Sequence, residues 1–315
     1  MNRHYAYFAW CFTKSVLRVL YDRYKGHSYY SSKRAGKRIL SLDEGNNFIH
    51  NKIIGGEPFM AARYGTSELN IMIKYIYKQY GFIREIPDRK MDSLCNNAGF
   101  FPYDKKAAEQ YAEMMLEASG QLDILGSWID IMEDFIIKIY APQSQLTHLS
   151  SLSSFESKRP WMSALEGKNV LVIHPFEESI RSQYQRRELL FENPKLLPRF
   201  NLLTIKSVQT IAGNKCEYAT WFDALESMIT KAANMEFDVA IIGCGAYGFP
   251  LAAKIKKMGR QAIHLGGQVP LLFGIRSVRT DNDPLTSKYY NEYWIRPSES
   301  EKPKGYETIE GGCYW

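Results

Sequence analysis

The sequence predicts an α/β protein with a Rossmann-like, mostly parallel sheet and helices on both faces. Two observations lead to this prediction. Short apolar segments at 169–174, 200–205, 237–243 and 261–265 alternate with helical segments, and strands covered on both faces show such continuous apolar runs. In addition, 45% of the 315 residues are hydrophobic, which is enough to build a full core.

The first half of the chain shows the same alternation. Residues 58–63 and 122–125 are short apolar runs typical of strands. Residues 68–80 and 105–119 carry apolar side chains at helical spacing, and the apolar residues of 128–140 are interspersed with acids, which also favours a helix. We therefore expect strand, loop and helix to follow one another from residue 58 onwards.

Composition divides the chain into two parts. Residues 1–50 form an aromatic and basic segment, and residues 51–315 are expected to form one α/β catalytic domain. Within that domain we distinguish an N-terminal half (51–142), a Ser-rich connector (143–168) and a nucleotide-binding half (169–315). The connector is interpreted either as a loop over a cleft or as a plain linker.

The N-terminal segment has two interpretations. Its rings and cations suit a helix that lies on a membrane surface, and they equally suit a helix that packs its rings on the body of the protein, which we favour on the sequence alone. Its longest uncharged run, 5–13, is far shorter than the roughly 20 apolar residues of a spanning helix. We therefore expect a cytoplasmic protein that is either free or peripheral at the inner face of the cytoplasmic membrane.

Charge and cysteine content exclude several classes of function. Forty Lys and Arg against 34 Asp and Glu give a net charge of +6, a bias too weak to indicate a nucleic-acid partner. The five cysteines are scattered and form no C-x-x-C pair, so neither a disulfide framework nor a thiolate zinc site is expected.

A glycine-rich turn is the clearest candidate binding motif. It fits G-x-G-x-x-G between a strand and a helix and comprises Gly243, Gly245, Ala246, Tyr247 and Gly248. Such a turn and the helix N-terminus that follows bind phosphate or diphosphate. A dinucleotide site also needs an acid about 20 residues later, and the strand at 261–265 offers none. The motif favours a phosphate-bearing ligand over NAD; alternatively, its glycines allow close packing.

Polar residues follow two further strands. Arg63, Gly65, Thr66 and Glu68 come directly after the strand at 58–63. A guanidinium binds phosphate bidentately, and Glu68 would act as a general base or hold a divalent cation. Alternatively, Thr66 caps the next helix and Glu68 is an ordinary first-turn acid. On the residues alone this capping interpretation is stronger.

Two more candidates complete the set. His174 ends the strand at 169–174 and would carry a proton or contact phosphate, although a lone histidine is as often structural. Asp223, near the start of another helix, is a second candidate for the base or for orienting a cation.

Two of these motifs resemble one family. The stretch from Gly243 to Gly267, with its L-A-x-x-I and Q-A-I-x-L-G pattern, resembles the nucleotide-sugar half of GT-D-type bacterial glycosyltransferases, which carry a G-P-T-A turn followed by L-A-x-x-L and Q-A-I-D-I-G-H. The stretch from Arg63 to Glu68 resembles that family's R-F-G-D-G-E. The resemblance spans about residues 58–275.

The resemblance implies a glycosyltransferase that moves a sugar from a nucleotide-diphosphate donor, in the first instance a UDP-sugar, to a glycan or lipid-linked acceptor of a surface polysaccharide such as a capsule or O-antigen. It also places Glu68 at the donor pocket, together with Arg63, His264, Gly266 and Gly267. Thr66 and His264 stand where the family has Asp, and Gly267 stands where it has His. These departures leave two alternatives for the diphosphate: either Mn²⁺ or Mg²⁺ is held differently, by Glu68 with His264 or His174 assisting, or arginine and helix dipoles neutralise the charge instead.

Two alternative functions stay open at this point. One is an NAD(P)-linked Rossmann oxidoreductase, and the other is a non-catalytic nucleotide-binding or scaffold subunit of a polysaccharide assembly complex. The aromatic residues of the last part of the chain either line a sugar site or fix the tail to the core, and we favour the second; they include Tyr293, Trp294, Tyr314 and Trp315. The sequence does not predict the stereochemistry of transfer or the oligomeric state.

Overall fold

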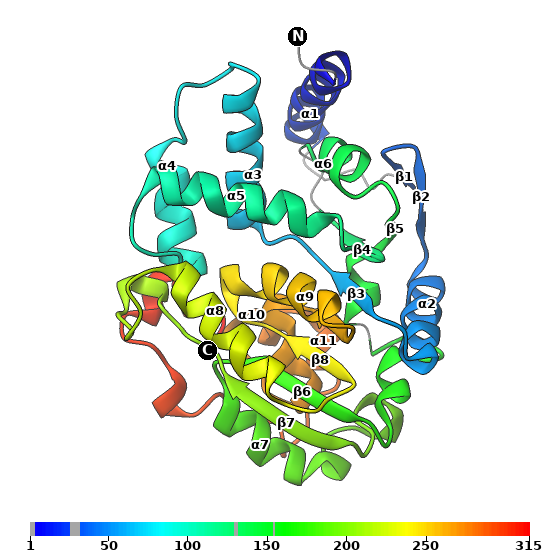
Figure 1. Ribbon diagram of the computed structural model, residues 1–315. Coiled ribbons are helices and arrows are strands. Elements are labelled where there is room, and N and C mark those ends of the chain that lie inside the picture. Colours follow the sequence, from blue (N-terminus) through cyan, green and yellow to red (C-terminus); the bar gives the residue numbers. More distant parts are fainter. Residues whose placement is uncertain (1–3, 26–31, 129–131, 154) are drawn as a thin grey trace.

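The computed structural model describes residues 4–25, 32–128, 132–153 and 155–315. Its described residues form a sheet in the order β1-β2-β5-β4-β3-β9-β8-β6-β7 (Figure 1). The strands are β1 (Lys33–Arg34), β2 (Lys37–Leu40), β3 (Phe59–Ala62), β4 (Ile124–Ser127), β5 (Gln145–His148), β6 (Asn169–His174), β7 (Asn201–Lys206), β8 (Val239–Ile242) and β9 (Gln261–His264). All described pairings are parallel except β1 with β2. The predicted α/β class is confirmed.

Both faces of the sheet are buried. In β3, Met60 packs in one core cluster and Phe59 in the other, because successive side chains of a strand point to opposite faces. In β6, Leu171 packs in the first cluster and Val170 in the second. The first cluster includes residues of α3 (Thr66–Gln79), α5 (Lys105–Ser119), α8 (Trp221–Ala233) and α9 (Gly248–Lys257); the second includes residues of α2 (Leu42–Gly55) and α7 (Glu177–Gln185). This two-sided burial accounts for the continuous apolar runs in the sequence.

Most of the predicted elements form close to their expected positions, with one shorter helix. The helix expected at 128–140 is described as α6 (Glu133–Tyr140), and 129–131 lie outside the described residues.

The Ser-rich stretch 143–168 differs from the connector that its composition indicates. It contributes β5, which pairs with both β2 and β4. The hydroxyls of Thr147 and Ser151 are 2.7 Å apart, and the indole of Trp161, which is fully buried, donates to Leu152 O at 2.9 Å. Because these polar groups form hydrogen bonds within the stretch, it packs as part of the body of the protein. Ser154 is outside the described residues.

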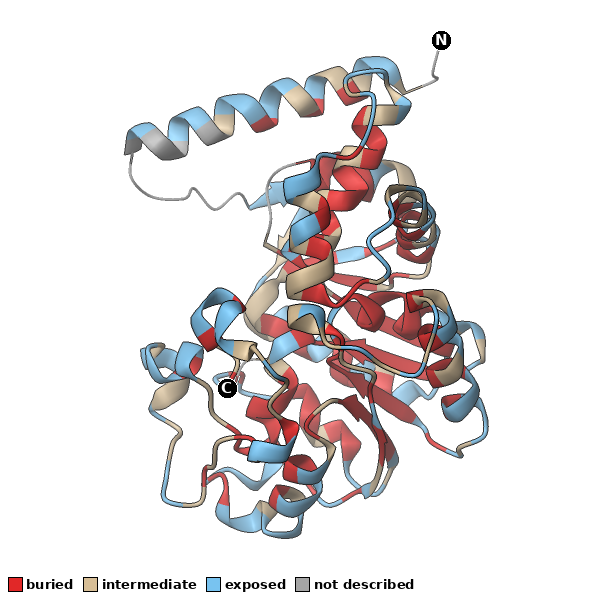
Figure 2. Cartoon of the chain, turned by 90° about the vertical axis from the view of Figure 1, so that its left-hand side faces the viewer, coloured by how far each residue is buried: buried red, intermediate tan, exposed pale blue. Residues whose placement is uncertain are grey.

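The N-terminal segment is also part of the sheet. It forms α1 (Tyr5–Lys25), β1, β2 and most of α2, so the expected boundary at residue 50 falls inside a helix. Helix α2 starts at Ser41, whose side chain forms a reciprocal capping box with Glu44. Helix α1 lies at the edge of the molecule and is largely exposed (Figure 2). None of the described helices has both the length and the apolar character needed to cross a bilayer.

Candidate active site

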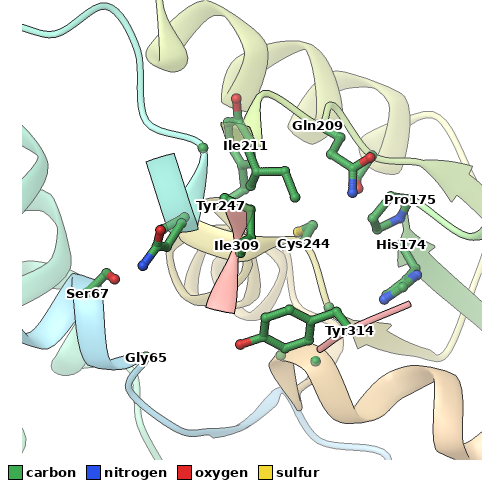
Figure 3. Close-up of a pocket in the computed structure, with 18 of the residues that line it drawn as sticks. Gly65, Ser67, His174, Pro175, Gln209, Ile211, Cys244, Tyr247, Ile309 and Tyr314 are labelled. Carbon is green, nitrogen blue, oxygen red and sulfur yellow. The ribbon is translucent and has the colours of Figure 1, made fainter. Parts of the chain in front are cut away.

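A cavity of about 480 Å³ opens at the carboxyl end of the sheet (Figure 3). Six neighbouring strands, in the order β4-β3-β9-β8-β6-β7, each contribute to it their last residue or the one that follows. These residues are Trp128, Arg63, His264, Gly243, His174 and Ser207. Ligands of open α/β sheets bind at this edge, so the topology brings the sequence candidates together where a substrate is expected.

The other walls include residues that the sequence did not single out, together with the aromatic tail that it did. On one side, the cavity is lined by the last residue of a short π-helix (Ser93–Asn97) and by Ala98 and Gly99, which follow it. Arg279 and the end of the chain form another wall, and both Tyr314 and Trp315 line the cavity. Figure 3 shows Gly65 and Ser67 on one side and His174 and Pro175 on the other, with Tyr314 drawn between them.

The tail therefore lines the cavity while it packs on the body. Trp315 is 5% exposed, whereas Trp294 is buried elsewhere and donates to Leu190 O at 3.0 Å. A Cβ added to Gly267 would lie 2.8 Å from Cε1 of Tyr314. The ring of Tyr314 thus occupies the room that a side chain at position 267 would need.

Arg63 carries the positive charge nearest the centre of this arrangement. Its guanidinium lies 4.8 Å from the ring centroid of Trp128, and the Trp128 indole is fixed by a 3.0 Å hydrogen bond to Tyr64 O. Burial lowers the pKa of Arg63, while Glu68 opposes this shift. No described carboxylate lies within ion-pair distance of its guanidinium. Withdrawing a cation from water without a paired anion costs free energy, and the half-buried Arg63 therefore suits a site that receives an anionic ligand.

Glu68 lies both at the N-terminus of α3 and at the cavity. It is the third residue of α3, and its carboxylate lies back over Gly65, where an added Cβ would be 2.0 Å from Oε2. Burial raises the pKa of Glu68, against the opposing effects of its own backbone N–H and of Arg63. The carboxylate therefore accepts a hydrogen bond at the helix N-terminus and also lines the cavity, while Thr66 is exposed.

Two buried histidines are neutral and have opposite tautomers. Burial lowers the pKa of both His174 and His264 to about 3, and Arg63 adds to the effect at His264. Nδ1 of His174 accepts a hydrogen bond from the Phe176 N–H at 3.0 Å, so its proton is on Nε2. Nδ1 of His264 lies 3.3 Å from Ile242 O, and a carbonyl accepts, so Nδ1 carries that proton. His174 thus has an N–H to donate, and His264 has a lone pair.

The glycine turn serves packing as well as the cavity. An added Cβ would lie 2.4 Å from Gly266 O at Gly243, 2.7 Å from Ala98 O at Gly245, and 2.3 Å from the His264 ring at Gly248. Gly243, Gly245 and Tyr247 line the cavity, whereas Ala246 and Gly248 do not. The packing interpretation therefore accounts for all three glycines, and the first two also form part of the cavity wall.

We expect Gly245→Ala to destabilise the protein more than Gly259→Ala does. Both glycines have a positive φ, +56° at Gly245 and +83° at Gly259. This backbone conformation costs a residue with a Cβ about 1–2 kcal/mol. An added Cβ meets the Ala98 carbonyl at Gly245 but nothing within 4 Å at Gly259, so overpacking adds about 1–3 kcal/mol at Gly245. Chemical unfolding of the two variants measures this difference, and equal losses would contradict the close approach.

Asp223 is not brought into the site. Its carboxylate accepts from the backbone N–H of Thr220 at 3.0 Å and from the Thr220 hydroxyl at 2.7 Å, and the Thr220 hydroxyl accepts from the Asp223 N–H. This is a capping box at the start of α8. Asp223 is exposed and does not line the cavity. The spacing Thr-x-x-Asp is the signal that indicates this role in the sequence.

The donor set does not fit a metal ion held by the protein. In the described part of the chain, no three His, Cys, Asp or Glu side chains gather as a group that could bind one. Glu310, a second carboxylate at the cavity, forms an ion pair with Arg279, and Thr66 contributes a hydroxyl rather than a carboxylate. Hard divalent cations need several oxygen ligands, and the described residues of this cavity do not supply such a set.

Comparison with known proteins gives a distant structural likeness. No protein-family model matches the chain, and no curated protein is significantly similar to it. Two solved structures of the domain of unknown function 1792 are similar to it; one is selenomethionine-substituted, and the other is described as having a distinct glycosyltransferase fold. Both are 12% identical, with TM-scores of 0.42 and 0.43, and cover 85% of this chain and 93% of their own.

Proposed function

We propose that the protein is a glycosyltransferase that binds a nucleotide-diphosphate sugar in this cavity and transfers the sugar to a glycan or lipid-linked acceptor. The observation that carries the proposal is the half-buried guanidinium of Arg63, which no described carboxylate pairs, at the meeting point of six strand ends. A diphosphate supplies the missing anion and matches the planar donor fork of arginine.

The donor is held by the residues that line the cavity. Arg63 contacts the diphosphate, and His174 adds a neutral N–H donor from its Nε2 atom. Tyr314 and Trp315 present aromatic faces suited to stacking on a sugar or base. The resemblance favours UDP as the nucleotide, and in the absence of a built metal site the protein's own cations neutralise the phosphates.

Glu68 is the base in this proposal. Burial raises the pKa of Glu68, which makes its carboxylate a stronger proton acceptor than an exposed one. The acceptor hydroxyl gives its proton to Glu68 while its oxygen forms the new glycosidic bond. The bond between the anomeric carbon and the diphosphate oxygen breaks, and the nucleoside diphosphate leaves with the electron pair. Arg63 stabilises the negative charge that develops on it.

A turnover assay tests this function. The purified protein is incubated with UDP-, GDP- and CMP-sugars and a panel of glycan and polyprenyl-phosphate acceptors, and release of the nucleotide is measured. We expect release from one donor class that depends on acceptor and is lost in the Arg63→Gln variant. Nucleotide binding without release for any pair would contradict a transferase and favour a non-catalytic binding subunit.

A further inference from the structure

Helix α1 presents an apolar face to solvent. Its buried side, with Phe8, Cys11 and Ser15, faces the body of the protein. The opposite side carries large apolar side chains that are 44–83% exposed: Trp10, Val16, Leu17, Leu20, Tyr21 and Tyr24. Figure 2 shows α1 at the edge of the molecule with most of its length exposed. Such a surface is unusual for a helix with solvent as its neighbour.

These exposed residues form one continuous stripe. At 3.6 residues per turn, the six side chains fall within a sector of about 140°. Of the other described residues, Ala6, Ala9 and Thr13 also fall in it, and no described charged side chain of α1 does.

The helix is fixed to the body, so this face is held outward. Phe8 stacks on Tyr80 with ring centroids 4.2 Å apart. Ser15 Oγ accepts from the backbone N–H of Met132 at 3.1 Å, and Lys14 forms an ion pair with Asp134. These contacts use one side of α1 and leave the apolar face uncovered by the described residues.

The positive charge of the protein is concentrated in the same segment. Residues 1–38 contain nine Lys and Arg and one acid, whereas residues 39–315 contain 31 Lys and Arg and 33 Asp and Glu. Among the described residues, ion pairs between this segment and carboxylates of the body include Lys14–Asp134, Arg34–Glu133 and Arg38–Glu44. The segment still has an excess of positive charge, which accounts for the whole net charge of the chain.

We propose that the outer face of α1 binds the surface of a membrane that contains anionic lipids, with the helix lying in the plane of the interface. Leucine and valine side chains enter the acyl boundary, and tryptophan and tyrosine lie at headgroup depth. The basic segment attracts the anionic headgroups, at about 1 kcal/mol per cation near the surface. A second copy of the chain fits this face less well, because a symmetric contact would bring two strongly basic segments together.

Vesicle co-sedimentation of the full chain tests the proposal. Vesicles of phosphatidylcholine alone are compared with vesicles that also contain phosphatidylglycerol. We expect saturable binding to the anionic vesicles, weaker binding in 0.5 M salt and little binding to the neutral ones. The double variant Leu17→Ser/Leu20→Ser should bind at least about tenfold more weakly. Leu285→Ser, at a 64% exposed leucine on α11 (Pro284–Ser287), is the matched control and should bind like the wild type.

Two results would overturn the proposal. One is no binding of the wild type to anionic vesicles, or equal binding of the double variant and the control. The other is self-association, measured by light scattering, that the double variant abolishes while the wild type fails to bind vesicles; that result would assign the face to a second copy. Thermal unfolding verifies that both variants fold, and the test is independent of any transferase activity.

Discussion

Replacing Arg63 with glutamine is expected to weaken nucleoside diphosphate binding by about 100-fold or more, without loss of stability. A bidentate contact to phosphate contributes two charge-assisted hydrogen bonds, each about 1.5–3 kcal/mol. The folded protein, in contrast, holds this half-buried guanidinium away from any described carboxylate, and desolvation lowers the pKa of Arg63. Removing that charge relieves a desolvation cost, so the melting temperature should stay the same or rise.

The opposite signs of the two effects make this variant diagnostic. Arg84→Gln, at an exposed arginine in the loop after α3, is the control and should change neither binding nor stability. Calorimetric titration and thermal unfolding are measured on the same preparations. A less stable Arg63→Gln protein that still binds nucleotide like the wild type would show that Arg63 is structural and would contradict its role at the site.

Replacing Glu68 with glutamine is expected to lower turnover by about 10²- to 10⁴-fold, the usual contribution of a general base. Glutamine is chosen because its amide oxygen still accepts the backbone N–H of residue 68, so the helix N-terminus keeps this contact. Loss of activity in a folded variant then reports on the carboxylate itself. Glu226→Gln, at an exposed glutamate of α8, should keep full activity.

The pH dependence of the reaction checks the same role. Burial raises the pKa of Glu68, so the wild-type rate should fall as pH decreases through this raised pKa, and the glutamine variant should lack that limb. A group with a raised folded pKa stabilises the fold below its unfolded pKa and loses that contribution as pH rises through the folded value. The glutamine variant should therefore gain stability relative to the wild type at neutral pH and lose that gain in acid. A wild-type rate profile shared by the variant would contradict the assignment.

Local sequence patterns predicted most of the sheet because six of its strands are short apolar runs. They did not predict β5, whose residues Gln145–His148 include two polar side chains and a histidine; its place is fixed by pairing with β2 and β4. Nor did they predict β1 and β2, because Lys33–Leu40 reads as a basic tail. Short strands with polar side chains near the end of a sheet carry little of the two-sided apolar burial that makes a strand recognisable in a sequence.

The candidate site was predictable where its residues end strands. Arg63, His174 and Gly243 could be found in this way, and the structure places all three at one cavity. Trp128 and Ser207 also follow strands, but a tryptophan and a serine there do not by themselves indicate a site, and nothing local indicates that Arg279, on α10 (Val278–Asp281), lies at the same cavity. Asp223 shows the reverse case: an acid near a helix start was interpreted as chemical, while its spacing from Thr220 is that of a cap.

We propose that the cavity binds a nucleoside phosphate through the protein's own cations. Calorimetric titration measures this binding directly. The purified protein is titrated with UDP, GDP, CMP and NAD, each with Mn²⁺ and with a chelator. We expect saturable binding of one nucleoside phosphate, UDP in the first instance, with an affinity that does not depend on Mn²⁺. Binding of NAD alone would show that the glycine turn binds a dinucleotide. No binding of any of the four ligands would show that its glycines serve packing only. Either result would contradict the proposal that the cavity binds the nucleoside phosphate of a sugar donor.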